Sequence, residues 1–183
     1  MVKILVLGPG AREHAIVKAL LSEATPHQVV CAPGNAGISA AGVETPALDY
    51  ADPTAVLAFV QEQGFDLVII GPEAPLVAGV ADPLRKIGVP VFGPDRGAAQ
   101  LEGSKAFAKR IMAEANVPTG RASRVENAEE AGRVLDEFGA PYVVKADGLA
   151  AGKGVLVTED RDAAIEHVAT WAPHGEVLVE LWL

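Results

Sequence analysis

Residues 143–155, with the sequence VVKADGLAAGKGV, contain the residue types that a phosphate-binding loop needs. An apolar run ends near Lys145, and a glycine- and alanine-rich stretch that includes Lys153 follows it. Because glycine has no Cβ, backbone N–H groups in such a stretch can approach an anion closely, and lysine adds positive charge beside them. The pattern predicts a loop between two strands that covers the phosphates of a nucleotide. For the loop taken alone, a flexible hairpin turn is the alternative.

The spacing excludes two common phosphate loops. A Walker motif needs glycine where this chain has Asp147, and Ser or Thr where it has Gly154; the G-x-G-x-x-G spacing of a kinase loop is also missing. By the period of two in a strand, Lys145 shares a face with Val143. A charged amine in so apolar a strand is costly unless it is paired, so we expect an anionic partner for it. The alternative is a lysine that extends its ammonium group to water at the strand end.

The first part of the chain alternates between strands and helices, which is typical of an open parallel sheet. Nearly continuous apolar runs predict buried strands, and a short run with Pro90 predicts an edge strand. The predicted strands are residues 2–7, 28–32, 66–70 and 89–92, and helices are predicted after the first strand and at residues 53–63 and 82–86. Ligands bind beyond the carboxyl ends of such strands, where we expect the loops that begin at Gly8, Pro33 and Gly71.

The loop after the first strand matches a dinucleotide-binding fingerprint only in part. Gly8 and Gly10 fit it, but Glu13 stands where the third glycine is required, and the second strand does not end in an acidic residue. A dinucleotide site is therefore disfavoured, whereas the following helix N-terminus could still be presented to a single phosphate. The next loop, residues 33–37, has the composition of a turn.

From residue 104 onward the pattern changes to α+β. Ser104 is a predicted N-cap for a helix over residues 105–115. Asn127 and Glu130 have the spacing of a capping box, which opens a helix that ends before Gly139.

The rest of this part is predicted to hold the lysine strand, an antiparallel hairpin closed over the glycine-rich loop, a helix over residues 162–171 and a strand over residues 176–183. The last strand ends on the apolar residues Trp182 and Leu183. Natural termini are usually polar, and an exposed apolar strand invites aggregation, so either these residues are buried or the chain is a fragment of a longer protein. We expect the fragment.

The composition is that of an ordered globular protein, with 50% hydrophobic and 21% charged residues. The net charge of −9 disfavours nucleic acid or an anionic membrane as the main partner. The single cysteine, Cys31, cannot form an internal disulfide, and we interpret it as a buried small hydrophobic residue. Neither a signal peptide nor a membrane-spanning run is recognisable, so a cytoplasmic location is expected.

Five motifs in this order closely resemble glycinamide ribonucleotide synthetase (phosphoribosylamine–glycine ligase), an ATP-grasp family of purine biosynthesis. They are Gly8-x-Gly10-x-Arg12-Glu13-His14-Ala15, residues 32–37 (APGNAG), residues 70–76 (IGPEAPL), residues 103–107 (GSKAF) and residues 144–155 (VKADGLAAGKGV). The family commonly has more glycine in the first loop, where this chain has Pro9 and Ala11. The last strand resembles the family's adenine-side hinge, although Leu181 replaces its second acid.

The resemblance implies two domains. Residues 1–103 would be an open parallel-sheet, pre-ATP-grasp domain that binds substrate, and residues 104–183 would be the first, small lid part of an α+β ATP-grasp domain. The implied reaction activates glycine with ATP as glycyl phosphate, which the amine of 5-phosphoribosylamine attacks to give glycinamide ribonucleotide, ADP and phosphate. Mg²⁺ or Mn²⁺ would assist, with ligands expected beyond this chain, which would be catalytically incomplete alone.

The resemblance also assigns site residues, none of them catalytic. The implied ATP-binding residues are Lys105, Lys145, Gly148, Leu149, Ala150, Ala151, Gly152, Lys153, Gly154 and Glu180. The implied substrate-binding residues are Gly8, Gly10, Arg12, Glu13, His14, Asn35, Gly71, Pro72 and Glu73, with His14 positioning or capping. Two alternatives remain: a related ATP-grasp carboxylate–amine ligase with another acceptor, and a non-catalytic module that binds a nucleotide or sugar phosphate.

Overall fold

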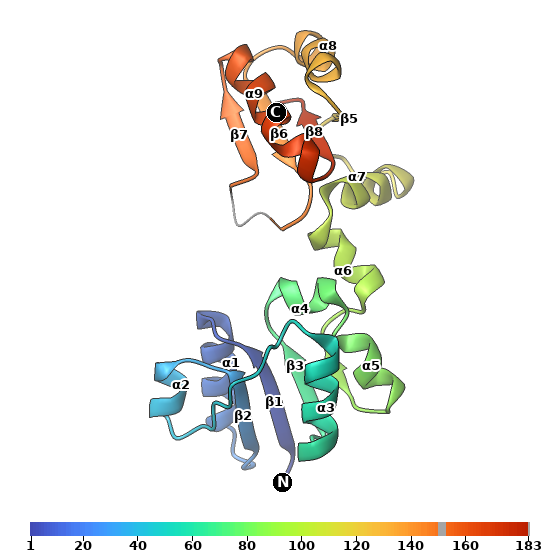
Figure 1. Cartoon of the computed structure of the whole chain (residues 1–183). Coiled ribbons are helices and arrows are strands. Elements are labelled where there is room, and N and C mark those ends of the chain that lie inside the picture. Colours follow the sequence, from blue (N-terminus) through green and yellow to red (C-terminus); the bar gives the residue numbers. More distant parts are fainter. Residues whose placement is uncertain (150–152, 183) are drawn as a thin grey trace. The chain divides into compact units, whose positions relative to one another are not determined.

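A computed structural model of the chain describes residues 1–149 and 153–182 and divides into two compact units, Met1–Ala99 and Gln100–Leu183 (Figure 1). The first unit contains β1 (Lys3–Gly8), α1 (Ala11–Leu21), β2 (Gln28–Pro33), α2 (Ala36–Ala40), α3 (Pro53–Gln63), β3 (Leu67–Ile70), α4 (Glu73–Ala78), α5 (Ala81–Lys86) and β4 (Val91–Phe92). Helix α6 (Arg96–Gly103) crosses the boundary between the units. The second unit contains α7 (Lys105–Glu114), β5 (Ala122–Val125), α8 (Ala128–Phe138), β6 (Tyr142–Ala146), β7 (Val155–Thr158), α9 (Arg161–Trp171), the 3-10 turn η1 (Ala172–His174) and β8 (Val177–Glu180).

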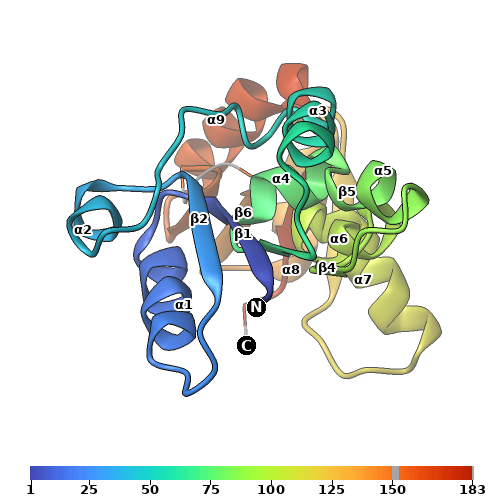
Figure 2. The same ribbon diagram turned by 90° about the horizontal axis from the view of Figure 1, so that it is seen from below.

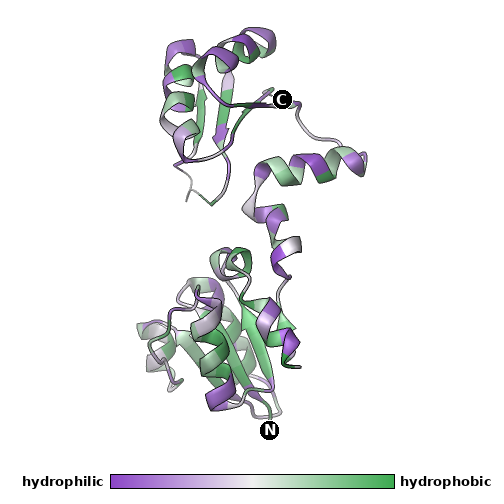
Figure 3. Cartoon of the chain, turned by 45° about the vertical axis from the view of Figure 1, so that its right-hand side comes forward, coloured by the Kyte–Doolittle hydropathy of each residue, from purple (hydrophilic) through white to green (hydrophobic). Residues whose placement is uncertain are grey.

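The first unit is built on a parallel sheet with strand order β2-β1-β3-β4, as predicted. Its inner strands are apolar on both faces because helices cover both. Val56 and Val60 of α3 and Leu84 of α5 pack on one face, and Val17 of α1 and Ile38 of α2 pack on the other. Figure 2 shows α1 and α3 on opposite sides of the sheet, and Figure 3 shows the hydrophobic colour concentrated in its strands.

The register of this sheet places three loops at one edge. Gly8 is paired with Pro33, and Leu7 with Ile70, so the loops that follow β1, β2 and β3 begin side by side. The backbone N–H of Gly71 donates to Leu7 O at 3.2 Å, which continues the ladder to the start of the third loop. The expected gathering of these loops at the carboxyl ends of the strands is confirmed.

The second unit is built on an antiparallel sheet with strand order β5-β8-β6-β7. Helices α8 and α9 cover one face through a core that includes Leu135, Ala164, Val168 and Val177. The predicted hairpin is confirmed: β6 and β7 pair antiparallel, with Lys145 opposite Val155. The last strand is shorter than predicted. It ends at Glu180. The backbone N–H of Leu181 still donates to Arg121 O at 2.8 Å, but the side chains of Leu181 and Trp182 are exposed.

Three α-helices and one strand were not predicted. Helix α2 has only five residues and begins inside the stretch interpreted as a turn, where Asn35 Oδ1 accepts from Ile38 N at 3.1 Å. Helix α4 contains Pro75 in its first turn, where a missing N–H breaks no helical bond. Helix α6 and strand β5 also lack a strong local signal, and β5 forms because it pairs with β8, far along the chain.

The interpretation of Cys31 as a buried residue is confirmed. Its side chain is fully buried in β2, and its thiol lies 3.5 Å from Gly8 O. Burial, with a smaller effect of the negative charge of Glu13, raises the pKa of the thiol from 9.0 to about 11.

This raised pKa makes a prediction about reactivity. Since the thiolate is the reactive form, native Cys31 should be labelled by iodoacetamide at pH 8 about 100-fold more slowly than an ordinary thiol, before its burial slows access further. Mass spectrometry of the protein labelled with and without urea measures this. Equal labelling rates in the two conditions would contradict the buried position.

Candidate functional site

Lys145 is placed by β6 and meets an acidic partner from the neighbouring strand β8. Its Nζ donates to Glu180 Oε2 at 2.7 Å, and the Glu180 side chain is only 11% exposed. The antiparallel register sets this pair, since Val143 lies opposite Glu180 and Lys145 opposite Leu178. The anionic partner expected for Lys145 is thus supplied by the chain itself.

A second lysine, Lys109, also lies beside Glu180, and it was not selected from the sequence. Its Nζ lies 3.6 Å from Glu180 Oε2 and donates to Thr119 Oγ1 at 2.8 Å and Gly120 O at 2.7 Å. The signal that could have found it is helical spacing: Lys109 is four residues after Lys105 on α7, so both side chains project from one face of the helix.

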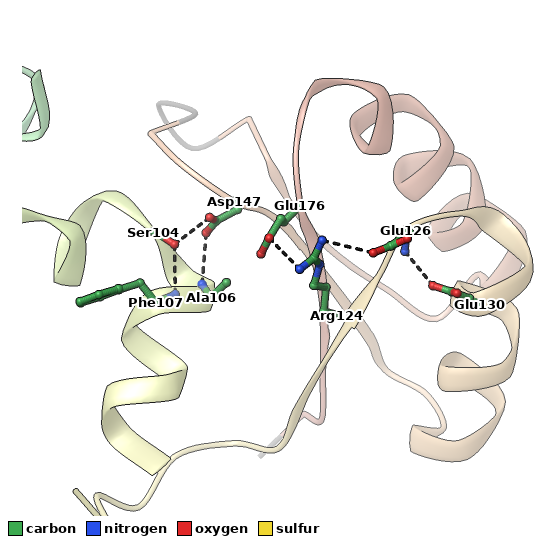
Figure 4. A network of polar contacts seen from close by, with 8 residues as sticks. All are labelled: Ser104, Ala106, Phe107, Arg124, Glu126, Glu130, Asp147 and Glu176. Carbon is green, nitrogen blue, oxygen red and sulfur yellow. Dashed lines mark hydrogen bonds and ion pairs between the residues drawn. The ribbon is translucent and has the colours of Figure 1, made fainter. Parts of the chain in front are cut away.

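Lys105 lies beside the beginning of the glycine-rich loop, and its Nζ donates to Gly148 O at 3.0 Å. The residue before that glycine, Asp147, occupies the N-terminus of α7 (Figure 4). One of its oxygens accepts from Ser104 Oγ at 2.8 Å, and the other accepts from the backbone N–H groups of Lys105 and Ala106. A carboxylate therefore already uses these helix donors, and the lysine ammonium groups are what this site offers to a phosphate.

The structure describes the residues at both ends of the glycine-rich loop, 148–149 and 153–154. Gly148 has a φ of 86°, which favours glycine, and Leu149 and Lys153 are exposed. Gly154 is buried, and its carbonyl accepts from Ala146 N at 2.7 Å and lies 3.3 Å from His167 Nε2. The other three residues assigned to this loop, Ala150, Ala151 and Gly152, lie outside the described residues.

An open groove of about 470 Å³ lies between α7 and the sheet of the second unit. Phe107 and Leu178 contribute apolar surface to it, and Lys109, which lies beside Glu180, also lines it. Arg124 of β5 also lines the groove and is held by Glu176 at 2.9 Å and Glu126 at 3.2 Å, as Figure 4 shows. None of these groove residues was assigned to a binding site from the sequence, although Phe107 lies in one of the five family motifs.

In the first unit, Glu13 lies at the centre of the gathered loops. It is 3% exposed, and its Oε2 accepts from Gly10 N at 2.7 Å, so it caps the start of its own helix. Its Oε1 is buried and has no hydrogen-bond partner within residues 1–149 and 153–182. A Cβ built on Gly8 would lie 2.9 Å from the Glu13 carboxyl carbon, so glycine is needed for the carboxylate to fit.

The tightest position around Glu13 is Gly71, where an added Cβ would lie 1.9 Å from Oε1. Gly71→Ala should therefore destabilise the protein by about 2 kcal/mol, since overpacking a closed site displaces its neighbours. Gly97→Ala is the matched control, because a Cβ there has 3.4 Å to its nearest neighbour. Urea unfolding measures both, and equal midpoints for the two variants would contradict this packing.

Arg12 and Glu73 form an exposed ion pair beside this cluster, with Nη2 and Oε1 3.0 Å apart. Arg12 also donates to Gly71 O, which ties α1 to the loop after β3. The backbone N–H of Glu73 itself, followed by Arg12, lowers the pKa of the Glu73 carboxyl, and the hydrogen bond to Glu73 raises the pKa of Arg12. Both groups therefore stay charged at neutral pH.

Asn35 and His14 also lie at the loops that follow the strands of the first unit. Asn35 Nδ2 donates to Pro9 O at 2.9 Å and so joins the loops after β1 and β2. A Cβ on Gly37 would lie 2.6 Å from His14 Cε1, which shows how closely His14 packs on α2. The structure thus brings together the residues of the first unit that were assigned to substrate binding.

Residues 1–149 and 153–182 contain neither a metal-binding cluster nor a membrane-spanning helix. Three or more His, Cys, Asp or Glu side chains do not gather there in an arrangement that could hold a metal ion. Among the helices of these residues, none combines the length and the apolarity that crossing a membrane requires.

Comparison with known proteins assigns both units to one family. Residues 2–102 match the family described as "Phosphoribosylglycinamide synthetase, N domain", and residues 103–179 match "Phosphoribosylglycinamide synthetase, ATP-grasp (A) domain". A phosphoribosylamine–glycine ligase from Leifsonia xyli is 69% identical over 99% of this chain and 43% of its own length. One from Streptomyces coelicolor is 55% identical over 90% of this chain and 39% of its own length.

Similar solved structures include a phosphoribosylamine–glycine ligase, in agreement with this family. The crystal structure of the phosphoribosylamine–glycine ligase from Thermotoga maritima matches 100% of this chain and 44% of its own, with a TM-score of 0.80 and 30% identity. N5-carboxyaminoimidazole ribonucleotide synthetase from Thermus thermophilus has the same fold at 20% identity, with a TM-score of 0.74 over 98% of this chain and 47% of its own. The chain spans less than half the length of these relatives, and it belongs to the phosphoribosylglycinamide synthetase family.

Proposed function

We propose that the chain serves the ATP-dependent ligation of glycine to 5-phosphoribosylamine, with the second unit contacting ATP and the first unit contacting the sugar phosphate. Membership of the family and the names of the relatives support the reaction. The description of residues 103–179 as an ATP-grasp domain supports the use of ATP. The observation that carries the proposal is the pair of lysines, Lys105 and Lys145, beside the ends of the glycine-rich loop.

In this proposal the second unit holds the phosphates of ATP with ammonium groups. Lys145 and Lys105 would contact phosphate oxygens, and residues 148–154 would cover them and exclude water while an acyl phosphate exists. A phosphate would compete with Glu180 for Lys145 and with Gly148 O for Lys105, so binding would exchange contacts within the chain. The hinge around Glu180 would face the adenine or ribose.

The first unit would receive phosphoribosylamine at its gathered loops. The backbone around Gly8 and Gly10, together with Arg12, offers donors for a phosphate, and the carboxylates of Glu13 and Glu73 offer acceptors for an amine or hydroxyl. Glu13 Oε1, which has no hydrogen-bond partner among the described residues, supports this assignment, because a buried acceptor gains most from a new donor. The remaining proposed contacts are His14, Asn35, Gly71 and Pro72.

The metal that ATP chemistry implies does not fit the described residues. They offer no gathered group of acidic or histidine ligands, so a step through Mg²⁺ or Mn²⁺ is not assigned to them. What the chain's own residues supply is binding and orientation of phosphate, sugar and amine.

Chemical-shift mapping by NMR tests the division between the two units. MgADP should perturb backbone signals around Lys105, Lys145 and Gly148, whereas ribose 5-phosphate should perturb those around Gly10 and Gly71. Arg133→Met, which removes an exposed charge from α8, is the control and should respond to both compounds as the unaltered chain does. MgADP signals confined to the first unit would contradict the proposal.

A further inference from the structure

Glu180 lies between two lysines that come from different elements. Lys109 approaches from α7 and Lys145 from β6, and both ammonium groups face the same oxygen, Oε2, at 3.6 and 2.7 Å. The exposed fractions of the side chains differ: 11% for Glu180, 19% for Lys109 and 29% for Lys145. A carboxylate this buried needs a positive partner at all times, because removing the partner of a buried charge is strongly unfavourable.

The two lysines are held very differently. Lys109 donates hydrogen bonds to Thr119 Oγ1 and Gly120 O, so two acceptors hold its ammonium group in place, 3.6 Å from Glu180 Oε2. Within the described part of the chain, Glu180 is the one acceptor that Lys145 contacts. Lys145 is also the more exposed of the two, and it lies on the strand that leads into the glycine-rich loop.

We propose that Lys109 is the permanent counter-charge of Glu180, which allows Lys145 to exchange Glu180 for a nucleotide phosphate. The exchange rests on the proposed function, whereas the pairing of Lys109 with Glu180 concerns the ligand-free protein. When Lys145 turns to a phosphate, Glu180 keeps a positive neighbour, and Lys145 returns when the phosphate leaves. Lys109 is thus a positioning residue that acts through Glu180 and does not itself touch the phosphate.

A double-mutant cycle in the ligand-free protein tests the pairing. The variants are Lys109→Met, Glu180→Gln and their combination, compared by midpoints of urea unfolding. We expect Lys109→Met to lower the midpoint in the unaltered chain and to lower it by less than half as much in the Glu180→Gln background. A loss of the same size in both backgrounds would mean that Lys109 only ties α7 to Thr119 and Gly120, and would overturn the proposal.

Arg110→Met is the matched control, since it removes a charge from the adjacent, exposed position of α7. Its effect should be the same with glutamate or glutamine at position 180. Lys109→Arg keeps the charge and should retain most of the stability. If Lys109→Met does not fold, this conservative variant carries the same cycle: a change that is independent of position 180 would again overturn the pairing.

Calorimetric titration with MgADP tests the exchange. Lys109→Met should weaken binding about tenfold, because Glu180 then retains Lys145, whereas Lys109→Arg, which keeps the counter-charge, should bind nearly as the unaltered chain does. In the unaltered chain, MgADP should shift the NMR signal of the Lys145 ammonium group more than that of Lys109. A larger shift at Lys109 would overturn the proposed roles.

The two proposals can fail separately. A chain that binds no MgADP would overturn the proposed function and the exchange at Lys145, while the ligand-free cycle would still decide whether Lys109 compensates Glu180. Binding without any loss in Lys109→Met would leave the proposed function standing and overturn the exchange.

Discussion

Lys145→Met is expected to weaken the binding of MgATP by about 10- to 100-fold, the effect of one lost hydrogen bond between charged groups. In the proposal, the ammonium group of Lys145 reaches a phosphate because it lies near the end of β6 and exchanges Glu180 for that phosphate. Methionine keeps the length and the apolar contacts of the side chain. Isothermal titration calorimetry measures the loss.

The same variant should retain most of its stability. Glu180 keeps Lys109 as a neighbour at 3.6 Å, so the removal of Lys145 does not leave it alone. The exposed residue Arg133 of α8 provides the control, and Arg133→Met should leave MgATP affinity unchanged. Unaltered affinity in Lys145→Met would contradict the assignment of this lysine to the phosphates.

Asp147→Ala is expected to destabilise the second unit by about 3 kcal/mol, because a charged acceptor of three hydrogen bonds is lost and two backbone N–H groups of α7 lose their partner. These bonds join the end of β6 to the start of α7, segments that are more than 40 residues apart in the chain. The loss should appear as a lower midpoint of urea unfolding.

Asp160→Ala is the matched comparison. Asp160 also accepts from two consecutive backbone N–H groups, those of Asp162 and Ala163, but it is the exposed local N-cap of α9. Its loss should cost about 1 kcal/mol, as is usual for a cap. A destabilisation by Asp147→Ala no greater than that by Asp160→Ala would show that the link between β6 and α7 contributes little.

Local patterns predicted much of the fold. Apolar runs located β1, β2 and β3 because strands covered on both faces must be apolar throughout. The start of one helix was also predicted correctly, since Ser104 accepts a hydrogen bond from the first turn of α7. The capping box at Asn127 was right only in part: Asn127 accepts from Glu130 N, but the Glu130 carboxylate accepts from Glu126 N.

What could not be predicted depends on partners distant in sequence. Strand β5 has an arginine among its four residues and forms only because Ala122 to Val125 pair with β8. In the same way, the ion pair of Lys145 with Glu180 follows from the register of two strands, which no local pattern reveals. Lys109 looks like a solvated helix residue in the sequence, and only the packing of α7 near β8 brings it close to Glu180.

A crystal structure of the chain grown with MgADP is the most direct test of the proposed nucleotide site. We expect phosphate oxygens within hydrogen-bonding distance of Lys105 Nζ and Lys145 Nζ, with residues 148–154 over them and Glu180 held by Lys109. Nucleotide bound instead at the loops around Gly10 and Gly71, with Lys145 still on Glu180, would contradict the account.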